Sequence, residues 1–161
     1  MPILIVNNTS YAYPDPGTEP GWGESATAWA QGVTDVLATL LAPGDILQSS
    51  YVINNAVASP ININGLAFNG AVTRAANVQY AIYRISTANP AGNAEQGTLY
   101  LTYDSAASSG NKWILASQNS GSNSGVIFSI TDSGQVQYIS TDINSVGYSG
   151  TIKFSAKTLG V

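Results

Sequence analysis

Residues 125–141 constrain the fold more strongly than any other stretch of the chain. Side chains at alternate positions are apolar on both sides of a short Asp132-Ser133-Gly134 connection, namely Val126, Phe128, Ile130, Val136 and Tyr138. Alternation with a period of two is typical of a half-buried β-strand. An Asp-x-Gly connection is typical of a hairpin, because Asp begins the turn and Gly supplies a positive φ. The stretch therefore predicts a β-hairpin.

The same pattern recurs from about residue 46 to residue 161. Short alternating runs are separated by Gly-, Ser- and Asn-rich segments, with no helical period between them. Seven or eight short strands at this spacing indicate an antiparallel sandwich or barrel. We therefore expect residues 46–161 to form a jelly-roll-like antiparallel β-sandwich. Its expected core residues are Val78, Tyr80 or Ala81, Leu99, Leu101, Trp113, Leu115, Val126, Phe128, Val136, Ile152 and Phe154.

Two segments without this alternation precede the expected sandwich. Residues 1–23 hold a short apolar run and then a Pro- and Gly-rich path, which excludes a helix and predicts an extended arm. Residues 24–45 hold one short amphipathic helix, since apolar side chains recur at helical spacing from Glu24 to Leu41 and Pro43-Gly44 ends the pattern. Neither segment has a core of its own, so each must pack on the chain's own sandwich or on a neighbouring molecule.

We expect the arm and the helix to form an assembly interface. Their large apolar side chains are the candidates for contact with a neighbour: Ile3, Ile5, Tyr11, Tyr13, Trp22, Trp29, Val33, Val36 and Leu40. Ala26 and Ala30 lie beside this stripe and are small enough to let another surface approach closely. A helix too short to persist alone and a small domain without cysteines both gain stability from neighbouring subunits. A homotrimer is therefore the expected state.

The composition narrows the class of partner. Charged residues make up only 9% of the chain, against about 25% in typical globular domains, which suits a protein that is packed into an assembly or secreted. The net charge of −4 and the scattering of the Lys and Arg residues argue against a nucleic-acid partner. No apolar run approaches the length of a membrane span, and the first residues lack the basic start of a signal peptide. We therefore expect no membrane partner and synthesis in the cytoplasm.

The residue types that most enzymes use are scarce. The chain has no histidine and no cysteine, which excludes Ser-His-Asp triads, thiolate metal sites and most zinc and iron sites. Asp104, Asp132 and Asp142 are the candidate acids for carboxylate catalysis, but each follows or ends a strand beside Ser, Thr or Gly, where Asp commonly forms a turn. We therefore expect no enzymatic activity, no cofactor and no metal.

Aromatic side chains offer another route to a ligand. The strand alternation places most of them in the core or in cross-strand pairs. Trp113 and Tyr148 lie nearest to the Gly- and Ser-rich loops. These two residues are therefore the candidate ligand contacts, with a host-surface glycan as the candidate ligand.

Two parts of the chain resemble known proteins. Residues 13–30, which begin Tyr-Pro-Asp-Pro-Gly-Thr-Glu-Pro-Gly-Trp-Gly-Glu and end Ala-Thr-Ala-Trp-Ala, resemble the N-terminal region of bacteriophage virion proteins, as do residues 40–45. A second part is similar to a β-domain of phage tail-fibre and head-decoration proteins. The stretches that carry this similarity are Gly65–Phe68, Arg74, Tyr80–Arg84, Gly97–Leu99, Gly125–Thr131, Gly134–Tyr138 and Tyr148–Phe154.

The resemblance implies a non-enzymatic structural protein on the exterior surface of a bacteriophage virion, made in the cytoplasm of the host bacterium. Because 161 residues leave no room for a long fibre shaft, we expect a capsid decoration or cement-type protein. It would dock on the major capsid protein or a tail protein through its arm and helix, with the β-domain outward. The first alternative is a tail fibre or tail-associated protein that binds a host glycan. The second is an accessory domain of a secreted or surface hydrolase.

Overall fold

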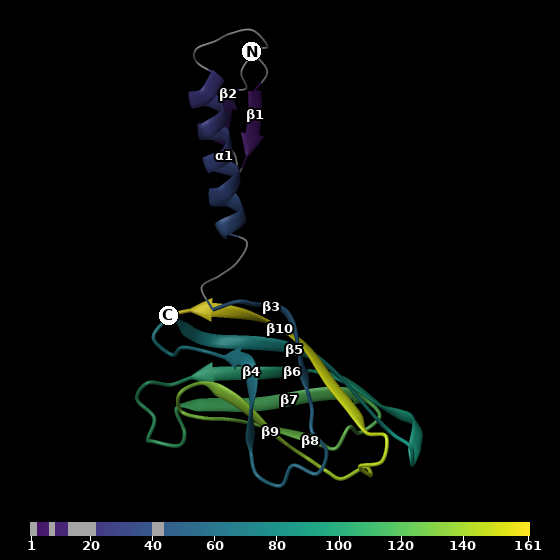
Figure 1. Ribbon diagram of the computed structural model, residues 1–161. Helices are drawn as coiled ribbons and strands as arrows, with labels where there is room; N and C mark the ends of the chain where they lie inside the picture. Colours follow the sequence, from purple (N-terminus) through teal and green to yellow (C-terminus); the bar gives the residue numbers. More distant parts are fainter. Residues whose placement is uncertain (1–2, 7–8, 13–21, 40–43) are drawn as a thin grey trace. The chain divides into compact units, whose positions relative to one another are not determined.

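The computed structural model describes residues 3–6, 9–12, 22–39 and 44–161 of the chain. The chain divides into two compact units, residues 1–42 and residues 43–161. Figure 1 shows the helix of the first unit and the strands of the second. The first unit contains the helix, and the second contains the β-sandwich.

In the described part of the first unit, residues 3–6, 9–12 and 22–39, the chain forms a pair of short strands and a helix. Strands β1 (Ile3–Val6) and β2 (Thr9–Ala12) pair antiparallel, and helix α1 spans Trp22–Thr39. The sequence predicts the extended run at residues 3–6 but not its partner strand, because the four residues of β2 are too few to show an alternation. The helix begins two residues before its predicted start at Glu24.

The second unit is an antiparallel β-sandwich, which confirms the predicted fold class (Figure 1). The larger sheet has five strands in the order β3 (Ile46–Val52), β10 (Ser149–Gly160), β5 (Thr73–Ser86), β6 (Asn89–Tyr103) and β7 (Trp113–Gly121). The smaller sheet has three strands in the order β4 (Ile61–Ala67), β9 (Gln135–Ser140) and β8 (Val126–Ile130). All strand pairs within the two sheets are antiparallel.

The hairpin that the sequence predicts at residues 125–141 is confirmed as β8 and β9. Phe128 lies opposite Tyr138, and the Gly134 N–H donates to the Thr131 carbonyl oxygen across the turn (2.9 Å). Gly134 has a φ of +82°, which residues with a side chain rarely adopt. A Cβ at this position would also overlap the Phe68 carbonyl oxygen. Both the turn and the neighbouring chain therefore require glycine here.

The core lies between the two sheets and follows the predicted alternation. In β5, alternate side chains from Ala76 to Ser86 are buried. The predicted core residues that are buried are Val78, Tyr80, Leu99, Leu101, Trp113, Val126, Val136, Ile152 and Phe154, while Leu115 and Phe128 are partly buried against them. Of the alternatives at the centre of β5, Tyr80 points inward and Ala81 is exposed. The core also contains apolar residues that the predicted core does not include, namely Ile53, Ile63, Leu66, Phe68, Ala76, Ile82, Tyr138 and Ala156.

Candidate functional site

The polar side chains of the five-stranded sheet form two groups, one turned toward the three-stranded sheet and one turned toward solvent. Arg84 in β5 belongs to the inward group and is fully buried. Its Nη1 donates to the carbonyl oxygen of Ser124 (2.5 Å), and its Nη2 donates to the carbonyl oxygen of Thr141 (2.6 Å) and to Oδ1 of Asn55 (3.0 Å). The guanidinium therefore ties β5 to the segments that precede β8, follow β9 and follow β3.

Tyr148, one of the two candidate ligand contacts, completes the Arg84 group. Its hydroxyl accepts a hydrogen bond from Nε of Arg84 (3.1 Å) and donates one to the carbonyl oxygen of Ile53 (2.7 Å). The guanidinium carbon lies 5.5 Å from the ring centroid, which is within the range of a cation–π interaction. The structure thus uses the hydroxyl and the ring of Tyr148 to hold Arg84.

Trp113, the other candidate ligand contact, lies in the core. Its side chain is 5% exposed, and its ring centroid lies 5.0 Å from that of Tyr103 and 6.1 Å from that of Phe68. The structure therefore corrects the assignment of Trp113 as a ligand contact. Although a loop precedes this residue, its position at the start of β7 turns the side chain inward.

Glu95 is the second charged residue of the inward group and is 5% exposed. Its carboxylate accepts hydrogen bonds from the Ser124 N–H (2.8 Å), the Tyr80 hydroxyl (2.9 Å) and Nδ2 of Asn119 (3.0 Å). Burial raises the pKa of Glu95, but these hydrogen bonds, above all that from the Ser124 backbone, outweigh burial and hold the pKa below its ordinary value of 4.5. The carboxylate is therefore ionised at neutral pH and serves as an acceptor for three separate segments.

Asp132, a candidate catalytic acid, connects two loops. Its Oδ2 accepts a hydrogen bond from the Gly110 N–H (2.5 Å), and its Oδ1 accepts one from the Lys112 N–H (3.1 Å). These two backbone hydrogen bonds lower the pKa of the Asp132 carboxyl. The side chain therefore fixes the β6–β7 loop to the β8–β9 turn.

The other two candidate acids also accept backbone hydrogen bonds. Oδ1 of Asp142 accepts from the Asn144 N–H (2.8 Å) and from Nδ2 of Asn55 (2.6 Å), and these bonds lower its pKa. Oδ1 of Asp104 accepts from the Ala106 N–H (2.9 Å). Within the ranges that the structure describes, no three His, Cys, Asp or Glu side chains lie close enough to hold a metal ion. In the same ranges, no helix is both long and apolar enough to cross a membrane.

The outward group of polar side chains lies in two rows across the five-stranded sheet. The strand register places Ser155, Gln79, Thr98 and Gln118 side by side in the first row. The second row contains Lys153, Ala81, Gln96 and Ser120. The side chains come from β10, β5, β6 and β7, so residues far apart in the sequence meet on one surface.

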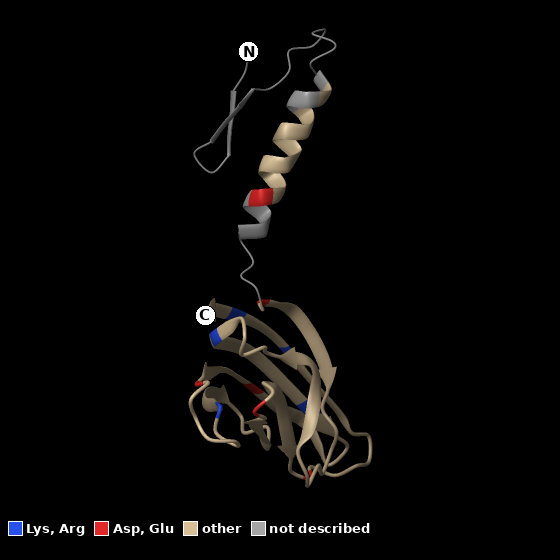
Figure 2. Cartoon of the chain, turned by 90° about the vertical axis from the view of Figure 1, so that its left-hand side faces the viewer, with Lys and Arg blue, Asp and Glu red and all other residues tan. Residues whose placement is uncertain are grey.

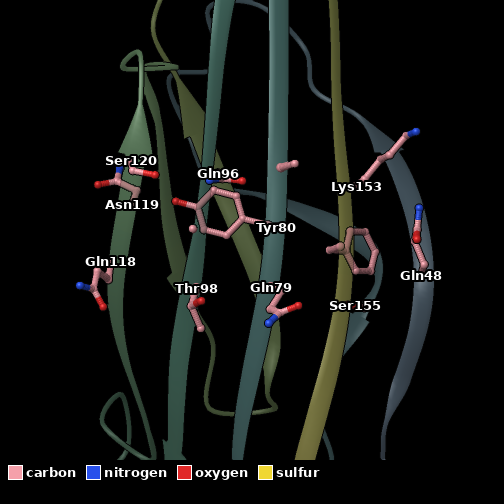
Figure 3. A pocket seen from close by; sticks show the side chains of 13 residues that line it. Gln48, Gln79, Tyr80, Gln96, Thr98, Gln118, Asn119, Ser120, Lys153 and Ser155 are labelled. Atoms are coloured by element: carbon pink, nitrogen blue, oxygen red, sulfur yellow. The ribbon is translucent and has the colours of Figure 1, made fainter.

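These rows line a shallow groove of about 630 Å³. Figure 3 shows Gln118 and Ser120 along one margin and Gln48 and Lys153 along the other. A second hollow of about 420 Å³ shares four residues with the first and continues to Tyr83. We call the two hollows together the outer trough, which is lined on its outward face by Gln48, Gln79, Ala81, Tyr83, Ala94, Gln96, Thr98, Gln118, Ser120, Thr151, Lys153 and Ser155.

An exposed aromatic ring stands at one end of the outer trough. Tyr83 is 46% exposed, and its ring lies over Gly92 in the β5–β6 hairpin. A Cβ at Gly92, which has a φ of +71°, would come within 2.7 Å of three atoms of that ring. The absence of a side chain at Gly92 therefore lets the ring rest on the hairpin backbone and restricts its position.

The polar side chains of the outer trough have few partners within the protein. Among the described residues, no side-chain hydrogen bond or ion pair involves Gln48, Gln79, Gln96 or Lys153. Each glutamine amide offers two N–H donors and one carbonyl acceptor. The outer trough can therefore bind a ligand that carries both donors and acceptors.

The candidate assembly residues belong to the first unit. Ile3, Ile5 and Tyr11 lie on β1 and β2, and Trp22, Trp29, Val33 and Val36 lie on α1. Trp29 is 39% exposed and Val33 is half-buried. Tyr13 and Leu40 lie outside the described residues. The assignment of these residues to an interface stays a prediction.

The comparisons with known proteins give limited similarity. No protein-family model matches the sequence, and the search of curated proteins found no match. Among solved structures, the chain is similar to the tailspike protein of Acinetobacter phage vB_ApiP_P1, with 16% identity and a TM-score of 0.45 over 70% of this chain and 21% of that protein. It is also similar to the tailspike protein of Acinetobacter baumannii phage AM24, with 9% identity and a TM-score of 0.34 over 73% of this chain and 26% of that protein. The chain thus spans about a fifth to a quarter of the two proteins' lengths.

Proposed function

We propose that this chain is a non-enzymatic structural protein of a bacteriophage virion, in which residues 1–42 attach to the particle and the sandwich faces outward. The observation that carries the proposal is the division of the chain into a sandwich with a core of its own and a separate N-terminal unit. A sandwich that holds its core without the first unit leaves that unit free to serve attachment. The sequence resemblance of residues 13–30 and 65–154 to phage virion proteins supports the same role.

The absence of enzymatic activity is supported by how the sandwich uses its acids. Glu95, Asp132 and Asp142 each accept hydrogen bonds from groups that hold strands or loops in place. Carboxylate catalysis requires one acid with a raised pKa near neutrality, whereas the pKa values of these three groups are lowered. This arrangement suits acids that stabilise the fold.

The charge distribution indicates which kind of surface the first unit would meet. Asp15, Glu19, Glu24 and Asp35 are the charged side chains of residues 1–42, so the whole formal charge of −4 belongs to this unit. The sandwich carries equal numbers of acidic and basic residues, which are spread along the chain and not clustered (Figure 2). Complementary charge favours specific association. The docking surface on the particle, whether on the major capsid protein or on a tail protein, would therefore be basic.

Particle binding tests the proposal. The full chain should bind virions that lack it, and a chain without residues 1–42 should remain folded but fail to bind. Binding of the full chain should weaken at high salt, because screening reduces the attraction between exposed charges. If the shortened chain decorates particles at normal occupancy, the sandwich holds the docking surface and the proposal is wrong.

A second candidate function is binding of a host-surface glycan by a tail-associated protein. The observation that favours it is the outer trough, which combines the exposed ring of Tyr83 with glutamine side chains that have few partners. Aromatic faces with nearby amides are suited to polyhydroxylated ligands, because the ring contacts C–H groups and the amides bond hydroxyls. A glycan array probed with the full chain tests this function independently of particle binding.

A further inference from the structure

We infer that the outer trough binds a segment of an acidic polysaccharide, with Lys153 contacting a carboxylate of the ligand. This inference rests on the second candidate function and adds the site, its residues and the charge of the ligand. It replaces Trp113 and Tyr148 as ligand contacts with residues of the outward face of the five-stranded sheet.

The shape of the trough suits a chain-like ligand. Its first hollow crosses the sheet from Gln48 on β3 to Gln118 on β7 (Figure 3). The second hollow opens from the same floor toward Tyr83. The floor is low at Ala81, because this outward position of β5 carries only a methyl group. Several linked sugar rings therefore fit along a continuous surface.

The hydrogen-bonding capacity of the trough matches sugar hydroxyl groups. A hydroxyl both donates and accepts, and so does a glutamine amide. Gln79 and Gln118 lie on either side of Thr98 in the first row, and Gln96 lies in the second row. None of these glutamines donates a side-chain hydrogen bond to another described residue. The amides of Gln79 and Gln96 are therefore available to a ligand without breaking a bond within the protein. The N–H groups of Gln118 are also available, whereas its Oε1 accepts a hydrogen bond from the Tyr100 hydroxyl (3.4 Å).

The charge of the trough favours an anionic ligand. Lys153 lines both hollows and forms no ion pair with any other described residue. Glu95 also lines the second hollow, but its side chain is turned into the sandwich and bonded to Ser124, Tyr80 and Asn119. The outward surface of the trough therefore presents one cation and no carboxylate. A uronic acid carboxylate supplies the missing partner.

Tyr83 supplies an apolar platform beside this cation. Its ring rests on the backbone at Gly92 and shares the second hollow with Ala81, Ala94 and Thr151. A platform that is already ordered costs little conformational entropy when a ligand binds. One face of a sugar ring can therefore pack on Tyr83 while its hydroxyl groups reach the amides.

A second copy of this chain is a less suitable occupant. The centres of protein–protein interfaces are enriched in aromatic residues, Met and Arg, whereas the trough is dominated by Gln, Ser, Thr and Ala. The composition of the trough therefore favours a polysaccharide over a second copy of the chain.

The test uses the full chain and an array of oligogalacturonate, alginate and hyaluronate fragments with their carboxyl-reduced counterparts. Binding of at least one acidic fragment and loss of binding on carboxyl reduction are expected. Lys153→Gln should weaken that binding about tenfold, since a charge-assisted bond is lost. Gln96→Ala should weaken binding to a smaller extent.

Two matched variants serve as controls. Lys157→Gln removes a lysine from the same strand that pairs with Asp45 and does not line the trough. Gln137→Ala removes a glutamine from the smaller sheet that bonds to Asn62. Both should leave the affinity unchanged within about twofold.

Three results would overturn the inference. These are binding to no acidic fragment, equal binding to the carboxyl-reduced forms, or no effect of Lys153→Gln. Self-association of the full chain that Tyr83→Ala abolishes would assign the trough to a second copy instead. These assays use no particle, so a negative result in them does not bear on the proposed attachment role of residues 1–42. A negative result in the particle-binding experiment likewise does not bear on ligand binding by the outer trough.

Discussion

The two faces of the five-stranded sheet carry polar side chains in opposite situations. On the inward face, Arg84 and Glu95 are buried and bonded to several fixed groups. On the outward face, Gln79, Gln96 and Lys153 are exposed and form no side-chain hydrogen bond with any other described residue. Glu95 and Gln96 are neighbours in β6. The first side chain is bonded within the sandwich, and the second is available to a ligand.

This difference separates polar residues that are bonded within the sandwich from polar residues that are available to a ligand. A buried polar group must be paired, because leaving it unpaired costs more than its bond contributes. An exposed amide already bonds with water and contributes little to the folding free energy. Substitutions on the inward face should therefore change stability, and substitutions on the outward face should change binding.

The largest expected effect follows replacement of Arg84. Arg84→Met keeps much of the volume but removes the donor to the carbonyl oxygens of Ser124, which is buried, and of Thr141. The free energy of unfolding should fall by about 3–5 kcal/mol, measured by urea denaturation. Arg74→Met, at an exposed position of the same strand, should cost less than about 1 kcal/mol. If the two variants lower the free energy of unfolding equally, the inward and outward faces do not differ in their contribution to stability.

A smaller loss of stability is expected at Glu95. Glu95→Gln keeps the shape of the side chain but replaces a charged acceptor of the Ser124 N–H and the Tyr80 hydroxyl with a neutral amide. The free energy of unfolding should fall by about 1–3 kcal/mol. The adjacent variant Gln96→Ala should change stability by no more than about 0.5 kcal/mol. If Gln96→Ala proves the more destabilising of the two, the outward residues contribute to the fold and the comparison is wrong.

Acid should destabilise the sandwich through its bonded carboxylates. The folded-state pKa values of Glu95, Asp132 and Asp142 lie below their ordinary values of 4.5, 3.8 and 3.8. The unfolded chain therefore binds protons first as the pH falls, so the stabilisation is complete above those ordinary values and is lost as the pH falls through the lowered ones. Melting temperatures recorded from pH 7 to pH 2 should decrease below about pH 4.5. Asp132→Asn should make this decrease shallower. An unchanged profile in this variant would show that the Asp132 carboxylate does not contribute to the pH dependence of stability.

The smallest effect on stability is expected at Lys153. Lys153→Gln should leave the melting temperature unchanged, because the exposed ammonium has no partner among the described residues. The same variant should lose most of its affinity for an acidic oligosaccharide. A clear drop in melting temperature would show that Lys153 stabilises the fold.

The inward face of the sandwich could be predicted from the sequence, whereas the polar groups within it could not. Alternation identified Val78, Leu99 and Phe154 as core residues because the period of two is a local property of a strand. Arg84 occupies a further inward position of the same alternation in β5. A pattern based on apolar residues does not select it, because its side chain is charged. Its partners Asn55 and Thr141 lie far away in the sequence, so no local signal relates them.

The outer trough depends on register. The sequence signal is that outward positions of neighbouring strands carry the uncharged polar residues Gln79, Gln96 and Gln118. Whether these residues share one surface depends on which positions of β5, β6 and β7 lie opposite one another. A shift of one residue would move a side chain to the other face. The candidate site therefore required the structure.

Glutamine side-chain signals in NMR spectra test the central claim most directly. The full chain, labelled with ¹⁵N, is titrated with the acidic oligosaccharide that binds on the array. The side-chain NH₂ signals of Gln79, Gln96 and Gln118 should shift. Those of Gln135, which donates to the carbonyl oxygens of Ile63 and Val136, and of Gln137 on the smaller sheet should stay in place. Shifts confined to Gln135 and Gln137, or no shift at any glutamine, would contradict the account.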